Sequence, residues 1–161
     1  YVAEYAKQSE YAEQPINYDA DYYGLELGYS ITDKGSALGE ITLGYEVLGS
    51  DDGKIAFQTP LATKHKFNGW ADLFLTTPVN GLTDLYISSS FNVFGKGKLG
   101  TELHQYRSDE KNMDYGQEFS ISYSHALPIK GLSALAKLSD YQAEEFSVDT
   151  QKLWLQMDYK Y

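Results

Sequence analysis

The residues most able to do chemistry in this chain are three histidines, His65, His104 and His125. A zinc site needs three or four His, Cys, Asp or Glu side chains that converge on one point. The histidines fall on three different segments, and the chain contains no cysteine. We therefore expect no metal site, and nothing in the sequence implies a cofactor.

A second candidate is the acidic turn at Asp51, Asp52 and Gly53, which resembles the start of a calcium-binding loop. The later ligand positions of an EF-hand are missing, so a solvated turn is the better interpretation. No Gly-x-Ser-x-Gly nucleophile motif is present either. We do not expect an enzyme, although a hydrolase that gathers Ser, His and Asp from different strands is an open alternative.

The composition narrows the class of protein. The 161 residues carry a net charge of −10 and a single arginine, Arg107, so we expect no nucleic-acid partner, which would require basic clusters. Fifteen tyrosines favour strands and the interface between membrane and water. No apolar run reaches the length of a transmembrane helix.

The element that must position these residues is the β-strand. Eight segments alternate apolar residues with polar or small ones, which places an apolar stripe on one face of a strand. The segments are residues 1–11, 23–31, 40–47, 84–93, 98–104, 118–124, 132–141 and 153–161. We predict an all-β fold, an antiparallel up-and-down transmembrane β-barrel with eight strands in this chain, either complete or half of a larger barrel. A soluble β-barrel or sandwich with its apolar stripes inside is the alternative.

The connections between these segments alternate in length. Short turns at 32–37, 94–97 and 126–131 fall at one end, and the loops 12–19, 49–82, 107–114 and 142–148 fall at the other. Short periplasmic turns and longer external loops are typical of bacterial outer-membrane barrels. We therefore expect residues 1–161 to form one barrel domain, or the C-terminal half of one, in contact with the lipid of a Gram-negative outer membrane.

Residues 49–82 are too long for an ordinary hairpin loop and too aromatic for a disordered tether. We expect this extracellular loop either to fold into the lumen as a constriction or to cap the barrel mouth. The constriction candidates are Asp51, Asp52, Phe57, His65, Phe67, Trp70 and Asp72.

The polar stripe supplies candidates for the lumen and its selectivity. They are Glu26, Glu40, Glu46, Asp84, Glu102, His104, Glu118, Lys137, Lys152 and Asp158. Acidic residues predominate in this set, which favours cations or neutral solutes over anions.

Residues 50–53 (SDDG), 56–63 (AFQTPLAT) and 67–72 (FNGWAD) resemble bacterial outer-membrane proteins of the porin-like alginate-export type. The resemblance implies a channel for passive passage of a small solute or sugar, and a barrel with roughly twice as many strands. A further N-terminal half or a second copy of the chain would then complete the wall. Alginate itself is not the expected cargo, because a polyanion calls for lumenal Arg and Lys. A non-conducting structural barrel is the other membrane alternative.

Overall fold

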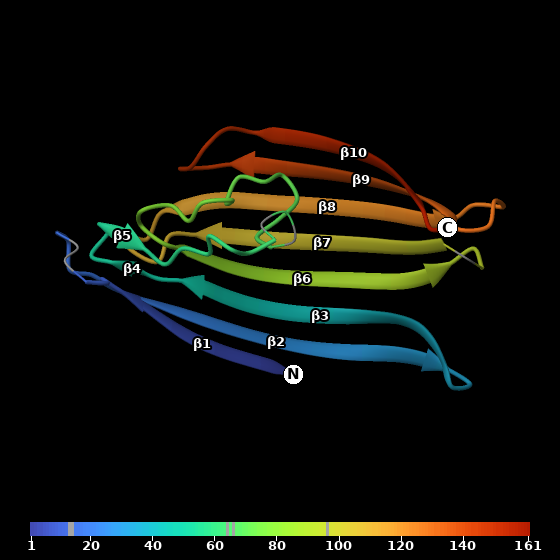
Figure 1. Cartoon of the computed structure of the whole chain (residues 1–161), viewed down its shortest axis with the longest axis horizontal. Coiled ribbons are helices and arrows are strands. Elements are labelled where there is room, and N and C mark those ends of the chain that lie inside the picture. The colour runs from blue at the N-terminus through green and yellow to red at the C-terminus, as the bar shows by residue number, and fades with distance from the viewer. Residues whose placement is uncertain (13–14, 64, 66, 96) are drawn as a thin grey trace.

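The computed structural model describes residues 1–12, 15–63, 65, 67–95 and 97–161 (Figure 1). Parts of the connections expected at 12–19, 49–82 and 94–97 therefore lie outside the described residues. One sheet is built from β1 (Val2–Ser9), β2 (Asp19–Asp33), β3 (Ser36–Leu48), β6 (Leu82–Val93), β7 (Gly97–Arg107), β8 (Asp114–Ala126), β9 (Leu132–Ala143) and β10 (Thr150–Tyr159). Two short strands, β4 (Ser50–Asp51) and β5 (Ile55–Ala56), form a separate hairpin.

The large sheet is an antiparallel meander in which each long strand pairs with the next one along the chain. The all-β prediction is confirmed, and each of the eight alternating segments corresponds to one strand of this sheet. The short turns gather at one end of the sheet and the long connections at the other (Figure 1). The described residues contain no helix of the length and apolarity needed to cross a membrane.

The eight strands do not close on one another. Among the described residues, strand β1 pairs only with β2, and β10 only with β9, so these two strands form the edges of an open sheet. A barrel closed by these eight strands alone is therefore wrong for this structure. An eight-stranded barrel has an interior just wide enough for its own side chains. Here the same face of the sheet also accommodates the main chain of a loop, which requires a wider radius.

The two faces of the sheet differ in chemistry. We call the face that carries Glu46, Asp84 and Glu118 the inner face, and the opposite one the outer face. On the outer face, one row of directly paired residues runs across five strands: Leu27, Leu43, Ile87, Leu103 and Phe119. Each of these side chains is between 46 and 54% exposed. The outer face is thus an apolar surface that the described chain leaves uncovered.

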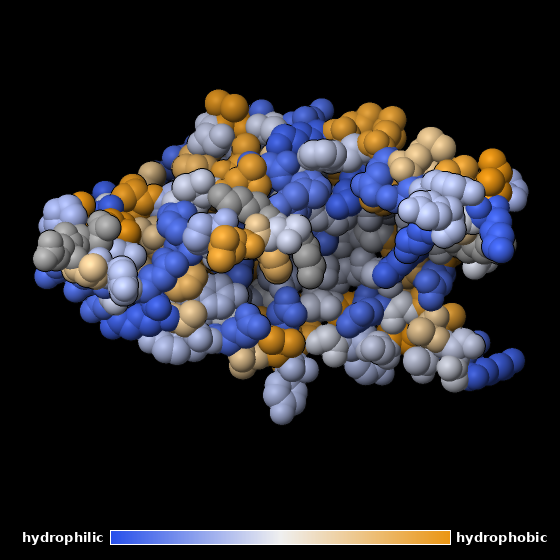
Figure 2. Space-filling model, in the orientation of Figure 1, coloured by the Kyte–Doolittle hydropathy of each residue, from blue (hydrophilic) through white to orange (hydrophobic). Residues whose placement is uncertain are grey.

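The described part of residues 49–81 folds back onto the inner face at the loop end of the sheet. Phe74 lies at the centre of an aromatic cluster there, with its ring centroid 4.4 Å from that of Tyr106 and 5.3 Å from that of Phe146. Tyr115 and Tyr141 complete this cluster. The space-filling view shows that the loop covers one part of the inner face and leaves a hollow beside it (Figure 2).

Candidate functional site

Five consecutive loop residues, 68–72, cross the inner face strand by strand. Asn68 contacts β3 and β6, Gly69 approaches β7 and β8, Trp70 contacts β8 and β9, and Asp72 contacts β10. The loop is therefore fixed to six neighbouring strands over a very short length of chain.

The crossing begins with a tight Asn68–Gly69 turn against two carboxylates. Glu46 and Asp84 are paired neighbours on β3 and β6, and the Asn68 amide donates to both, at 2.5 and 3.3 Å. Gly69 has a φ of +85°, and a Cβ built there would lie 2.2 Å from the Tyr106 hydroxyl. Only glycine meets both conditions, because it tolerates positive φ and has no side chain to clash.

Glu118 on β8 is the principal anchor of the loop. Its side chain is 1% exposed, and its carboxylate accepts the backbone N–H groups of Trp70 and Ala71, the former at 2.5 Å. The hydroxyls of Ser120 and Ser139 donate to the same carboxylate at 2.7 and 2.8 Å. A buried carboxylate is stabilised by this many donors, so burying Glu118 also orders the loop backbone.

At its far end, the segment 68–72 is held by an ion pair with β10. Asp72 accepts from the Lys152 ammonium on β10 at 3.1 Å and lies 2.7 Å from the His65 imidazole. His65 in turn packs on Trp154, with ring centroids 4.6 Å apart. The Lys137 ammonium lies 4.5 Å from the centroid of the Trp70 ring, a cation–π contact.

A second polar cluster lies beside the loop on β2, β6 and β7. His104 is buried, 2.9 Å from the Asp84 carboxylate and 3.5 Å from that of Glu102. Tyr86 stacks on His104 and donates its hydroxyl to Glu26. The His104 imidazole thus contacts two carboxylates, those of Asp84 and Glu102. Glu26 is satisfied by a neutral phenol instead.

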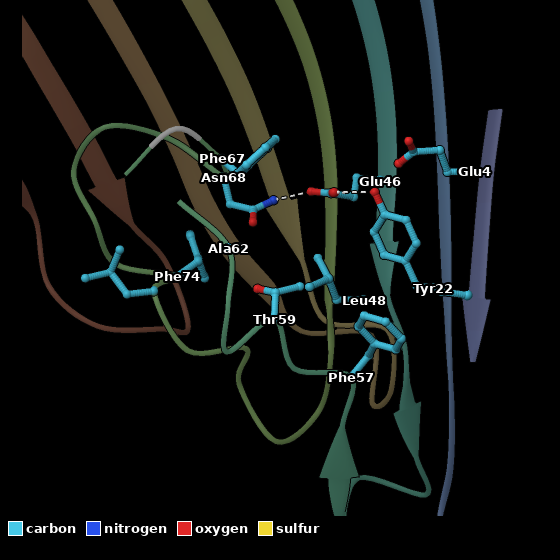
Figure 3. Close-up of a pocket in the computed structure, with 12 residues that line it drawn as sticks. Glu4, Tyr22, Glu46, Leu48, Phe57, Thr59, Ala62, Phe67, Asn68 and Phe74 are labelled. Atoms are coloured by element: carbon cyan, nitrogen blue, oxygen red, sulfur yellow. Dashed lines mark hydrogen bonds between the residues drawn. The ribbon is translucent and has the colours of Figure 1, made fainter. Parts of the chain in front are cut away.

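Two cavities open between the loop and the strands. The larger, about 550 Å³, is lined by Glu26, Glu46, Asp84, Glu102 and His104, among others. The smaller, about 270 Å³, lies under the loop between β1, β2 and β3 and is mainly apolar (Figure 3). Glu46 borders both, and Figure 3 shows Asn68 and Tyr22 reaching its carboxylate from two sides.

The structure places all ten lumen candidates on the inner face, because the pairing register gives them the same side of the sheet. It brings eight of them into the loop contacts and the adjacent polar cluster. Glu40 and Asp158 are exposed and lie apart, at the turn end. Glu102 joins the cluster only through His104.

The constriction candidates also divide into residues that contact the strands or the cavities and residues that lie apart from them. Phe57 packs on Tyr22 with ring centroids 5.4 Å apart, and Trp70, His65 and Asp72 join the crossing. Phe67 borders both cavities. Asp51 and Asp52 belong to the β4–β5 hairpin, where Asp52 pairs with Lys54 at 3.3 Å. Within the described ranges, no group of three or more His, Asp or Glu side chains is arranged to hold a metal ion.

The sequence candidates omit several residues on which the site depends. Asn68 and Gly69 position the loop, and the Asn-Gly dipeptide is a turn signal that could have been read. Tyr86 and Tyr106 lie on the inner face, where the alternation predicted a polar stripe. The aromatic ring of Tyr86 concealed its hydrogen bond to Glu26. Tyr106 packs against Phe74, and its buried hydroxyl has no hydrogen-bond partner among the described residues.

Comparison of the chain with protein-family models, curated proteins and solved structures finds no match. The resemblance to porin-like proteins of the alginate-export type therefore depends on the sequence motifs alone.

Proposed function

We propose that this chain is part of the wall of a passive outer-membrane channel for small solutes, narrowed by the loop at residues 49–81. The observation that carries the proposal is the contrast between the two faces of one sheet. The outer face exposes a continuous row of apolar side chains, while the inner face is polar and holds a fixed loop. A lipid-facing exterior and a wet interior require this contrast, whereas a soluble protein would bury the apolar row.

The dimensions of the outer face are consistent with a bilayer. On β2, the outer positions from Tyr23 to Ile31 are all apolar or aromatic and follow Asp21. This stretch corresponds to about 27 Å of strand. A transmembrane β-strand tilted by about 45° needs about 9–11 residues, and Tyr23 to Ile31 is nine residues long. The free edges of β1 and β10 supply the backbone groups through which further strands, or a second copy, would complete the wall.

Selectivity in this proposal comes from the inner face. Glu26, Glu46, Asp84 and Glu102 surround the larger cavity, where His104 is the single titratable base among the described residues that line it. A pore lined in this way attracts cations and admits neutral solutes.

The test is ion conductance. Purified protein is refolded in detergent and added to a planar lipid bilayer. We expect stepwise openings of uniform size with a preference for cations over anions. Protein that inserts into lipid vesicles yet gives no openings would refute the channel.

A non-conducting structural barrel is favoured by one specific observation, the Phe74 cluster that fills the loop end of the inner face. In that case the inserted protein is silent in the bilayer. The variant Glu118→Ala, which frees the loop, would also remain silent.

A further inference from the structure

The smaller cavity adjoins the larger one at Glu4 and Glu46, and its two ends differ chemically. Figure 3 shows the carboxylates of Glu4 and Glu46 near one end of the cavity and the side chains of Leu48 and Phe57 near the other. Ala6 and Phe74 add further apolar lining. A ligand that fits must therefore be apolar over most of its length and polar at one tip.

The charge at the polar end is not neutralised. Glu46 accepts hydrogen bonds from Tyr22, at 2.8 Å, and from Asn68, at 2.5 Å, and both donors are uncharged. Glu4 makes no hydrogen bond or ion pair within the described part of the chain. No Lys, Arg or His among the described residues lines this cavity. Two carboxylates at one end of an apolar cavity attract a cation.

The apolar end favours the same class of ligand. The rings of Tyr22 and Phe57 stack with centroids 5.4 Å apart, so their faces and edges form one wall. Aromatic faces attract ammonium groups, and their area accommodates an apolar body. The volume of about 270 Å³ lies near the lower limit for small-molecule pockets, which suits a fragment-sized molecule.

The wall formed by β1 is held in place. Gln8 donates its side-chain amide to the Gln58 carbonyl at 2.7 Å and accepts the Gln58 backbone N–H at 2.8 Å. This two-point contact joins the edge strand to the loop, so both walls of the cavity are fixed before a ligand arrives. A site formed in advance loses less entropy on binding.

We propose that this cavity binds a small hydrophobic ammonium ion, with its ammonium group between Glu4 and Glu46 and its apolar body against Leu48, Phe57 and Phe74. The inference goes beyond the proposed channel, because binding of such a cation requires no conduction. A protein that is silent in bilayers but binds the cation would leave this inference intact.

The test uses 2-phenylethylammonium as the probe, titrated into the refolded protein by isothermal calorimetry. Its neutral counterpart, 2-phenylethanol, has nearly the same size and shape. We expect the ammonium ion to bind at least about tenfold more tightly, since it adds a positive charge and charge-assisted hydrogen bonds to the same apolar body. Equal binding of the two compounds, or no binding of the ammonium ion, would overturn the proposal.

Variants locate the site. Glu4→Gln is expected to weaken binding of the ammonium ion about tenfold without unfolding the protein, because Glu4 lies exposed on an edge strand. Ala6→Trp fills the cavity and should abolish binding. Glu40→Gln is the matched control, since Glu40 lies on the same strand and face as Glu46 but about 20 Å away. Unchanged affinity in both Glu4→Gln and Ala6→Trp would place the ligand elsewhere and refute the assignment.

Discussion

Tyr86 on β6 reaches across Gly44 on the neighbouring strand and donates its hydroxyl to Glu26 on the strand beyond. Gly44 makes this possible, because a Cβ at that position would lie 2.0 Å from the Tyr86 ring. The three residues form one directly paired row on the inner face. A glycine in a strand usually weakens it, and here the Tyr86 ring covers the backbone that the missing side chain leaves bare.

Gly44→Ala should therefore displace Tyr86 and break its contact with Glu26. We expect the free energy of unfolding to fall by about 1–3 kcal/mol, the usual cost of overpacking, as measured by urea titration. In a Tyr86→Ser background, Gly44→Ala should cost much less, because the ring that it displaces is already gone. Gly28→Ala is the control, since its new Cβ meets only the flexible ends of Glu40 and Thr42. If the two alanine variants prove equally stable, the packing of Tyr86 over Gly44 is not a constraint.

Glu118→Ala should release the loop from the inner face. The change leaves two backbone N–H groups and two serine hydroxyls without their acceptor, at a cost on the order of 3 kcal/mol. We expect faster chymotrypsin cleavage within residues 57–75 and, in the proposed channel, a larger single-channel conductance. Glu40→Ala, at an exposed position of the inner face, should change neither measurement. Unaltered proteolysis would show that other contacts suffice to hold the loop.

Leu103→Arg examines the outer face. In a lipid-facing surface, an arginine near the bilayer midplane costs about 2–4 kcal/mol, so the yield of protein folded into lipid vesicles should drop. Ser90→Arg carries the same charge on the inner face and should insert normally. Equal insertion of both variants would contradict the assignment of the apolar row to lipid.

The acidic inner face predicts a measurable ion preference. Neutralising Glu26 and Glu102 together, as Glu26→Gln with Glu102→Gln, should shift the reversal potential in a KCl gradient towards zero, because both carboxylates line the larger cavity. Asp52→Asn removes an equal charge from the exposed β4–β5 hairpin and should have a smaller effect. A reversal potential that is insensitive to the double change would place the selectivity elsewhere.

The strands were predictable because the period of two persists through each of them, from Tyr23 to Ile31 and again from Leu153 to Tyr159. Closure of the sheet could not be predicted, since the alternation is the same in an open sheet and in a barrel. The turn at Asn68 and Gly69 could be predicted from the Asn-Gly dipeptide itself. The strand residues that hold the loop could not. Glu118 lies 48 residues from Trp70, and Lys152 lies 80 residues from Asp72. Contacts at such separations depend on sheet curvature, which no local pattern encodes.

The crossing of residues 68–72 also sets an order of events during folding. Its partners on β8 and β10, the acceptor Glu118 and the donor Lys152, lie 48 and 80 residues further along the chain, so the loop has no place to dock until most of the sheet has paired. Contacts of this range form slowly. Until then Trp70 and Phe74, both buried in the finished protein, remain in water. The interval before docking is the stage at which this chain is most prone to aggregate and most in need of a chaperone.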